Sequence, residues 1–505
     1  MFYNLLIMTA TTLLMRFVGV TFNVYITNRI GSLGIGLFTL VMSVGGFAVT
    51  FATSGVNLAA TRLTAEAMGR GDEVAIRQAM RRCIIYSLCF GITASVGLLL
   101  FSKPIALCIL KDERCILPLR LFSVSLPCIS LSSAMNGYFT AQRRVIKNAA
   151  TGFFEQFIKI TVTVYAVGML GPKGIEYACV AVILGGMTAE LSSFVFTYVM
   201  YKRDLKKHNR RSGLGDATLT RKLFGIALPI AFTTYVRSGL VTVEHLLIPW
   251  GLKKQGSSVE RALSSYGMLH GMVFPIILFP QAVLSAFAGL LVPEVSECMA
   301  AGEYARIERI SSRVIQSALA FGIGVSGIML CYSSLLGQAI YQSDEASAFI
   351  CLLSPLIPVM YLDHVVDGLL KGLGEQLYCM RVNITDAAMS VLLVWLFVPI
   401  SGIYGYIMIV IAMEIVNTAL SLIRLMSRVN VRVELGKWIV KPLLCIIGAT
   451  SLSGILTTVI TPGSLGVAVD AFISVSVCAL IYFILLRILG SVSRDDIRWF
   501  RSAIR

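Results

Sequence analysis

The dominant pattern along this chain is a succession of apolar segments, each long enough to cross a lipid bilayer. About 20 residues of α-helix cross the hydrocarbon core, and a helix satisfies its backbone hydrogen bonds internally, as lipid requires. The pattern predicts fourteen spans, which are residues 4–29, 35–61, 83–102, 116–141, 149–170, 177–201, 223–250, 266–293, 314–336, 347–370, 379–399, 403–426, 438–460 and 466–489. The predicted fold class is all-α, a polytopic membrane protein.

Composition supports the membrane class and argues against an enzyme. Of 505 residues, 56% are hydrophobic and 14% are charged, whereas soluble domains are about 25% charged. The sequence contains no Walker loop, HExxH, GxSxG or nucleotide fingerprint, and no clustered metal ligands. We therefore predict a protein that is not an enzyme, with no catalytic residues, no cofactor and no metal site.

The net charge of +16 is distributed as a topology signal. Of the 43 Lys and Arg residues, 31 lie in loops that follow even-numbered spans and only eight in loops that follow odd-numbered ones. Because short basic loops stay in the cytoplasm, we predict a plasma-membrane protein whose N- and C-termini are both cytoplasmic. The surplus charge would also contact anionic membrane lipids, and it does not indicate nucleic-acid binding.

An internal duplication appears at a constant offset in residue number. The run "EAMGRGDEVAIRQAMRRCI" at 66–84 matches "ECMAAGEYARIERISSRVI" at 297–315, and the same offset relates Gly36 to Gly267 and Glu155 to Asp386. Spans 1–6 and 7–12 are thus two copies of one six-helix unit in parallel orientation. Two such lobes leave a cleft between them, and rocking about it is the usual basis of alternating access.

The duplication divides the chain into four parts. We predict an N-lobe at 1–201, a basic cytoplasmic linker at 202–222, a C-lobe at 223–427, and spans 13 and 14 with a basic cytoplasmic tail at 428–505. We expect the protein to act as a monomer.

Two stretches resemble a known family. "MNGYFTAQRRVIKNAATGFFEQFIKI" at 135–160 and "LFPQAVLSAFAGLLVPEVSE" at 278–297 resemble the stage V sporulation protein B and polysaccharide biosynthesis (oligosaccharide flippase) family. The resemblance implies the MOP superfamily, which also holds lipid II flippases and MATE multidrug antiporters. It implies a flippase that moves an undecaprenyl-pyrophosphate-linked oligosaccharide or cell-wall precursor from the cytoplasmic to the outer leaflet.

Two arginines lie at mid-depth in spans 1 and 7, where an ionisable group costs about 2.5–3.5 kcal/mol and marks a functional candidate. Aligning Gly31 with Gly251 puts Arg16 opposite Val236, one position from Arg237. A guanidinium matches phosphate oxygens bidentately. We predict that Arg16 and Arg237 bind the pyrophosphate, with Arg62 as an entrance charge.

The alternative for both mid-depth arginines is a structural ion pair with an acid on a neighbouring helix, such as Glu190 or Glu414.

Acids within the spans suggest two further roles. Asp363 and Asp367 share one face of span 10, where proton or sodium binding would couple to the lobes; the alternative is solvation at the helix end plus a pair with Lys371. Glu155 and Lys159 are four residues apart with the acid first, which favours a structural ion pair.

Two other functions remain open at this point. The first is a MATE-like, cation-coupled multidrug exporter, which would use membrane-embedded carboxylates. The second is a non-transporting membrane scaffold that docks envelope-synthesis enzymes on its basic loops. Charge reversal of Arg16 and Arg237 separates them, because only the flippase should fail.

Overall fold

The computed structural model describes residues 2–142, 144–205, 218–431, 434–460 and 466–491, and these ranges are helical with short connections. Eleven helices in these ranges are long and apolar enough to cross a membrane. This confirms the predicted all-α, polytopic class. Residues 206–217 of the predicted linker and the tail from 492 lie outside the described residues.

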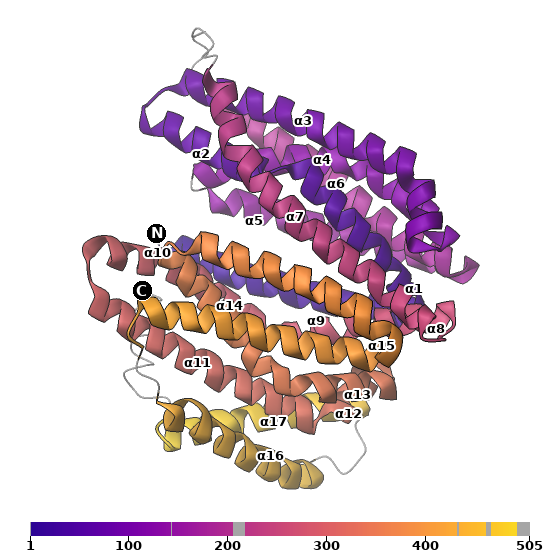
Figure 1. The fold of residues 1–505 in the computed structure, drawn as a ribbon, viewed down its shortest axis with the longest axis vertical. Helices are drawn as coiled ribbons and strands as arrows, with labels where there is room; N and C mark the ends of the chain where they lie inside the picture. Colours follow the sequence, from indigo (N-terminus) through magenta and orange to yellow (C-terminus); the bar gives the residue numbers. More distant parts are fainter. Residues whose placement is uncertain (1, 143, 206–217, 432–433, 461–465, 492–505) are drawn as a thin grey trace. The chain divides into compact units, whose positions relative to one another are not determined.

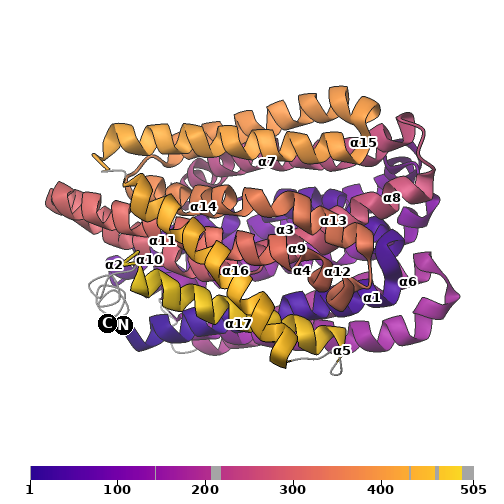
Figure 2. The same cartoon turned by 90° about the horizontal axis from the view of Figure 1, so that it is seen from below.

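Two helices are each long enough for two crossings. α1 (Phe2–Thr53) has 52 residues and α15 (Gln376–Arg428) has 53. Such a helix is about 80 Å long, since each residue adds roughly 1.5 Å. Each bends at a glycine with a positive φ, Gly31 (φ 73°) and Gly402 (φ 64°), a conformation that glycine adopts without steric cost. Figures 1 and 2 show the two arms of α15 folded back on one another.

Contacts divide the chain into two compact units. Unit 1 consists chiefly of residues 25–267, and unit 2 of residues 268–505 together with 12–24. Beyond the second arm of α1, unit 1 contains α2 (Val56–Gly69), α3 (Glu73–Pro104), η1 (Ile105–Leu110), η2 (Glu113–Cys115), α4 (Ile116–Ala141), α5 (Val145–Leu170), η3 (Gly171–Lys173), α6 (Ile175–Leu205), α7 (Thr218–Lys254) and α8 (Val259–Gly267).

The core of unit 1 lies among α2, α3, α4, α6 and α7. Its buried members include Met80, Tyr86, Met135, Tyr138 and Leu223. Close helix contacts depend on small residues, as is usual in membranes. A Cβ added to Gly137 of α4 would lie 2.4 Å from the carbonyl oxygen of Asn57 in α2, so these two helices touch through their backbones.

Unit 2 begins with a segmented stretch where the sequence predicted one continuous span. In place of a single helix over 266–293, α8 is followed by η4 (Met268–Val273, a π-helix), α9 (Phe274–Leu278) and α10 (Gln281–Ala301). The break between α9 and α10 falls at Phe279–Pro280. Proline has no backbone N–H and interrupts the hydrogen-bond ladder, which explains the break.

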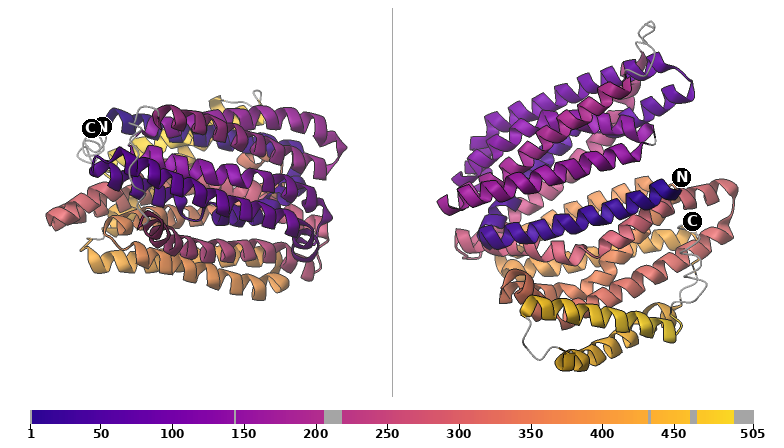
Figure 3. Two further views of the ribbon diagram at one scale, coloured as in Figure 1. Left: turned by 90° about the horizontal axis from the view of Figure 1, so that it is seen from above. Right: turned by 180° about the vertical axis from the view of Figure 1, so that it is seen from behind.

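The remaining helices of unit 2 are α11 (Tyr304–Cys331), α12 (Ser333–Tyr341), α13 (Asp344–Leu353), η5 (Ser354–Leu356), α14 (Ile357–Gly372), α15, η6 (Gly436–Val440), α16 (Lys441–Ile460) and α17 (Val467–Ile488). α16 and α17 lie side by side (Figure 3) and pack on α11. Tyr482 of α17 donates to the carbonyl oxygen of Ala320 at 2.6 Å. Its ring lies against Gly324, where an added Cβ would be 2.4 Å away.

Backbone conformations repeat at the offset of the sequence duplication. Gly71 and Gly302 are both left-handed, with φ of 67° and 72°. Lys111 and Gln342, which the same offset pairs, adopt the same left-handed conformation with φ of 55° and 52°. Left-handed residues other than glycine are uncommon, so this recurrence indicates that corresponding stretches of the two halves fold alike.

Candidate functional site

Helix α7, which carries Arg237, is attached to α1 by a row of polar contacts. Tyr235 donates to the hydroxyl of Ser54 at 2.5 Å, Ser238 to Thr50 at 3.2 Å, and Thr242 to the carbonyl oxygen of Ser43 at 3.1 Å. The rings of Tyr235 and Phe51 also stack, with centroids 5.4 Å apart. These contacts fix the rotation of α7 about its axis.

The contact with Ser54 is possible because the chain turns there between α1 and α2. Ser54 is fully buried and has φ of 42°, and Gly55 has φ of 69°. Tyr86 of α3 donates to the Ser54 carbonyl oxygen at 3.1 Å, and its hydroxyl lies 2.8 Å from that of Ser54. The turn is therefore held by α3 on one side and α7 on the other.

Arg237 lies on the face of α7 away from this row. At 100° per residue it is about 200° around the helix from Tyr235. Its side chain is exposed, and within the part of the chain that the structure describes it makes no ion pair or hydrogen bond. Within unit 1, Arg237 makes no ion pair with Glu190, one of its two alternative partners.

Arg16 belongs to unit 2. It lies beside Phe17, whose ring is 6.2 Å from that of Phe279, and one face of the helix is attached where Asn23 donates to the carbonyl oxygen of Gly271 at 3.0 Å. The positive charge of Arg16 acts on His364 of α14. Arg16 is exposed and, among described residues, pairs with no acid.

Arg62, the predicted entrance charge, lies on α2. It forms an ion pair with Glu66 at 3.3 Å, and its side chain is 65% exposed. An exposed pair of this kind contributes at most about 1 kcal/mol. Arg62 is thus free to exchange Glu66 for another anion.

The two predicted coupling acids have different surroundings. Asp367 of α14 forms the expected i,i+4 ion pair with Lys371, at 2.6 Å. Asp363, one turn earlier, accepts a hydrogen bond from the amide of Asn417 on α15 at 3.1 Å. The side chain of Ser421, also on α15, interacts with the Asp363 carboxylate as well. The Oδ1 atoms of Asp363 and Asn417 are buried and have no hydrogen-bond partner in the described ranges.

Two acids of α15 stand near Asp363, and sequence reasoning did not place them there. The negative charges of Asp386 and Glu414 act on one another and on Asp363. The sequence suggests for Glu414 only the role of an ion-pair partner for a mid-depth arginine. The offset that pairs Asp386 with Glu155 was the available signal that the fifth helix of each half carries an acid.

In unit 1, Glu155 of α5 accepts a hydrogen bond from Ser193 of α6 at 3.2 Å. The structure records no ion pair between Glu155 and Lys159, both of which are described, although the Lys159 charge acts on Glu155 and on Glu190. Glu155 is therefore held by a neighbouring helix, and Lys159 acts on it from beyond contact distance.

A charge cluster surrounds a buried acid near the end of α6 in unit 1. Asp204 of α6 is 3% exposed and is bound by Arg144, by Lys147 at 3.1 Å and by the hydroxyl of Tyr138 at 3.2 Å. Arg144 and Lys147 lie at the junction of α4 and α5. The cluster thus ties this junction to the end of α6.

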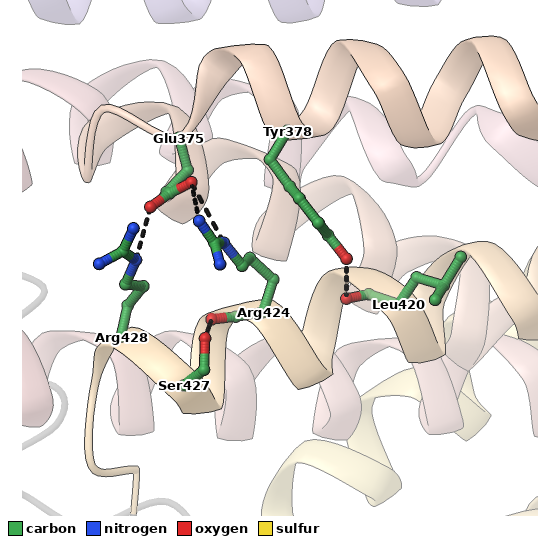
Figure 4. Close-up of polar contacts among 6 residues, drawn as sticks. All are labelled: Glu375, Tyr378, Leu420, Arg424, Ser427 and Arg428. Carbon is green, nitrogen blue, oxygen red and sulfur yellow. Dashed lines mark hydrogen bonds and ion pairs between the residues drawn. The ribbon is translucent and has the colours of Figure 1, made fainter.

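The matching cluster in unit 2 has the opposite polarity. Glu375, which the duplication offset pairs with Arg144, accepts from Arg424 at 2.8 Å and from Arg428 at 2.5 Å, both near the end of α15 (Figure 4). The guanidinium of Arg424 also lies 5.0 Å from the ring centre of Tyr378. Hydrogen bonds from Arg424, with the charges of both arginines, lower the pKa of Glu375.

Comparison with known sequences places these features in a family. The family described as "Polysaccharide biosynthesis protein" matches residues 2–299. The chain is similar to stage V sporulation protein B of Bacillus subtilis (strain 168), with 25% identity over 98% of this chain and 96% of that protein. It is also similar to lipid II flippase MurJ of the same organism, with 19% identity over 73% of this chain and 72% of that protein.

Solved structures agree on the fold. Lipid II flippase MurJ in an inward closed conformation matches with a TM-score of 0.70 and 12% identity, over 99% of this chain and 100% of that one. An inward-facing MATE multidrug resistance transporter matches with a TM-score of 0.64 and 12% identity, over 83% and 94%. The chain therefore belongs to the polysaccharide biosynthesis protein family and has the multi-pass helical fold of MurJ and of MATE transporters of the MOP superfamily, with sequence similarity to stage V sporulation protein B and MurJ.

Proposed function

We propose that this protein is a flippase for an undecaprenyl-pyrophosphate-linked oligosaccharide or cell-wall precursor, which it moves from the cytoplasmic to the outer leaflet. The observation that carries the proposal is the pair of mid-helix arginines, one in each unit. Arg16 and Arg237 are exposed, and in the described part of the chain neither is neutralised by an acid.

An arginine kept at mid-depth without an acid partner needs a compensating anion or water. A guanidinium stays protonated at any physiological pH and offers parallel N–H donors. A diphosphate presents several oxygens in the geometry that this fork binds. Each of the two arginines would therefore bind oxygens of the diphosphate headgroup.

Movement of the headgroup would follow from rocking of the two predicted lobes, 1–201 and 223–427, with the N- and C-termini in the cytoplasm. In this scheme Arg62 exchanges Glu66 for the arriving diphosphate, because the exposed pair is weak. Anionic lipids contact the basic loops, and the protein acts as a monomer with access to envelope-synthesis enzymes.

Asp363 would couple transport to a cation. The Oδ1 atoms of Asp363 and Asn417 are buried and have no hydrogen-bond partner among the described residues. A sodium ion would satisfy both oxygens, and a proton would satisfy that of Asp363. Asp367 would contribute through the local negative charge, although Lys371 partly neutralises it. Occupation of the site would change the charge buried between α14 and α15 and so bias the lobe equilibrium.

The same acids favour a second candidate, a cation-coupled exporter of small organic cations. Asp363, Asp386 and Glu414 gather between α14 and α15, and membrane-embedded carboxylates suit such an antiporter. An exporter of organic cations does not need Arg16 and Arg237, so substitution of these arginines distinguishes the two functions.

The deciding experiment measures flipping of a fluorescent polyprenyl-diphosphate lipid in reconstituted vesicles. Arg16→Glu and Arg237→Glu should abolish flipping, because each replaces attraction of the diphosphate by repulsion. The matched control is Arg29→Glu, which reverses a charge in α1 where Arg29 lies over the ring of Tyr25 at 5.7 Å. Flipping by both arginine variants at the rate of Arg29→Glu would refute the proposal.

A further inference from the structure

A cavity of about 230 Å³ lies inside unit 1 where the ends of α7 and η1 meet α1. Its wall includes Leu40 of α1 and Leu246 and Pro249 of α7, and its charged members are Lys111, Lys253 and Lys254. Trp250 also lines it, with the Lys254 ammonium 5.2 Å from the ring centre. The cavity therefore combines an apolar wall with three amines.

Asp112, the acid that acts on Lys253, is bound to another residue. Asp112 accepts from the guanidinium of Arg114 at 2.6 and 2.9 Å and from the Arg114 backbone N–H at 3.0 Å. Lys111, Lys253 and Lys254 make no ion pair with any described residue. Asp112, Lys111 and Arg114 all act on Lys253, so the single carboxylate of Asp112 faces several positive charges and cannot neutralise them all.

The conformation of Lys111 brings its amine to this site. It is left-handed, with φ of 55°, a conformation that a residue with a side chain adopts at some cost. The turn places Asp112 at the start of η2, where it binds Arg114, and leaves Lys111 lining the cavity. The matching residue of the second half, Gln342, has the same left-handed conformation but is neutral, so the positive charge at this position occurs in the first half alone.

The wall and the charges together select a lipid phosphate. Basic pockets between membrane helices bind anionic lipid headgroups, and tryptophan favours the membrane interface. A free phosphate would leave Leu40, Leu246 and Pro249 in contact with water. The volume is below the roughly 300–1,000 Å³ of pockets for drug-sized ligands, so it suits a headgroup and not a whole oligosaccharide.

The cavity lies at the opposite end of unit 1 from Arg62. α2, which carries Arg62, leads into the start of α3, and α3 runs 32 residues to Pro104, just before η1. That length is about 48 Å. Arg237 lies on α7 between the two ends, about 24 Å along the helix axis before Lys253. Positive charge thus occurs at both ends and in the middle of one unit.

We propose that this cavity is the second docking site of the cargo, where the diphosphate headgroup is held at the end of its passage. The proposal rests on the proposed function, since it assigns the same diphosphate lipid to a new site. The lysines receive the headgroup after Arg237, and the apolar wall receives the first part of the lipid chain. Because amines bind phosphate as point charges, release into the leaflet requires no rearrangement.

The test uses Trp250 as a local reporter. In a chain where Trp395, Trp438 and Trp499 are replaced by Phe, undecaprenyl diphosphate in detergent micelles should change the Trp250 fluorescence in a saturable way. The variant Lys111→Gln/Lys253→Gln/Lys254→Gln should bind roughly 100-fold more weakly, since each basic group near a membrane phosphate contributes roughly fivefold. Substitution of the same three lysines by Arg should retain binding, which shows that the site still folds.

A charge-matched control removes three other basic residues of loops that follow odd-numbered spans. Lys103→Gln/Lys173→Gln/Arg261→Gln changes exposed side chains that do not line the cavity, and it should bind like the parent. Binding by the lysine-to-glutamine variant within threefold of the parent would overturn the proposal. So would equal affinity for cardiolipin, or displacement of the lipid by inorganic pyrophosphate at an equal concentration.

Failure of this inference can be told apart from failure of the proposed function. Arg237→Glu should stop flipping while the Trp250 response to undecaprenyl diphosphate persists, because the cavity is intact. If Arg237→Glu stops flipping but the parent shows no Trp250 response, the second docking site is refuted and the flippase function stands.

Discussion

The crossing of Gly36 and Gly267, two residues that the duplication pairs, gives a quantitative test of the fold. Gly36 of α1 lies against α8, and a Cβ added to it would be 2.1 Å from the carbonyl oxygen of Leu263. Ordinary contacts begin at 3.4 Å, and the obstacle is backbone, which cannot rotate away. Gly36→Ala must therefore push α8 back by roughly 1 Å, a backbone shift of the kind that overpacking causes.

The expected cost follows from two losses and one gain. Overpacking of this kind costs about 1–3 kcal/mol. The hydrogen bond between Ser32 and Ser264, 2.6 Å long at the same crossing, would stretch, at a cost of about 1 kcal/mol. Replacing a helical glycine by alanine returns about 0.5–1 kcal/mol. Gly36→Ala should thus lower the free energy of unfolding by about 1–3.5 kcal/mol.

The assay is reversible unfolding in mixed detergent and SDS micelles, followed by circular dichroism. The matched control is Gly46→Ala in the same helix, because nothing lies within 4 Å of its Cβ position, and it should be neutral or slightly stabilising. Gly267→Ala would meet the Gly36 Cα at 2.5 Å, so the double variant should lose less than the sum of the single ones. Equal stability of Gly36→Ala and Gly46→Ala would refute the close crossing.

Three further predictions concern the polar contacts. Tyr235→Phe removes the 2.5 Å hydrogen bond to Ser54 and should cost about 1 kcal/mol in the same unfolding assay, while the exposed Tyr304→Phe should cost nothing. Asp363→Asn should make flipping independent of sodium and of the proton gradient, and an unchanged cation dependence would exclude Asp363 as the coupling residue. The arginine partners of Glu375 lower its pKa. The ion pairs therefore stabilise the fold fully above the ordinary glutamate pKa of about 4.5, and this stabilisation is lost as the pH falls through the lowered pKa. Glu375→Gln should therefore lower the melting temperature at pH 7 more than at pH 3, and an equal loss at both values would contradict the ion-pair account.

The helical segments could be predicted from the sequence because hydropathy alone fixes them. Helices cover most residues of every predicted span, although the spans 35–61, 266–293, 314–336 and 347–370 are each divided between two or more elements. The kinks at Gly31 and Gly402 fall between spans that the sequence predicts as separate. The break at Pro280 was not predicted, since most of the surrounding residues are apolar. A proline inside an apolar run leaves open whether the helix bends or stops, and the packing around it decides.

The site was only partly predictable, for a physical reason. Spacing within one helix identified the pair of Asp367 and Lys371, which the structure contains. It could not show that Asn417 approaches Asp363, because that contact joins residues 54 positions apart. The charge clusters of Asp204 and Glu375 were not predicted because most of their partners lie dozens of residues away in the sequence. Arg144 and Glu375 share the duplication offset with reversed charge, which was the one signal present.

The most direct test of the account is the initial rate at which reconstituted protein flips a polyprenyl-diphosphate lipid, compared between Arg237→Glu and Arg29→Glu. Truncating one partner of a close charge pair costs about 2–5 kcal/mol, so the account predicts a rate at least roughly 30-fold lower for Arg237→Glu, with Arg29→Glu near the wild-type rate. Equal rates for the two variants would contradict the claim that a mid-depth guanidinium carries the diphosphate.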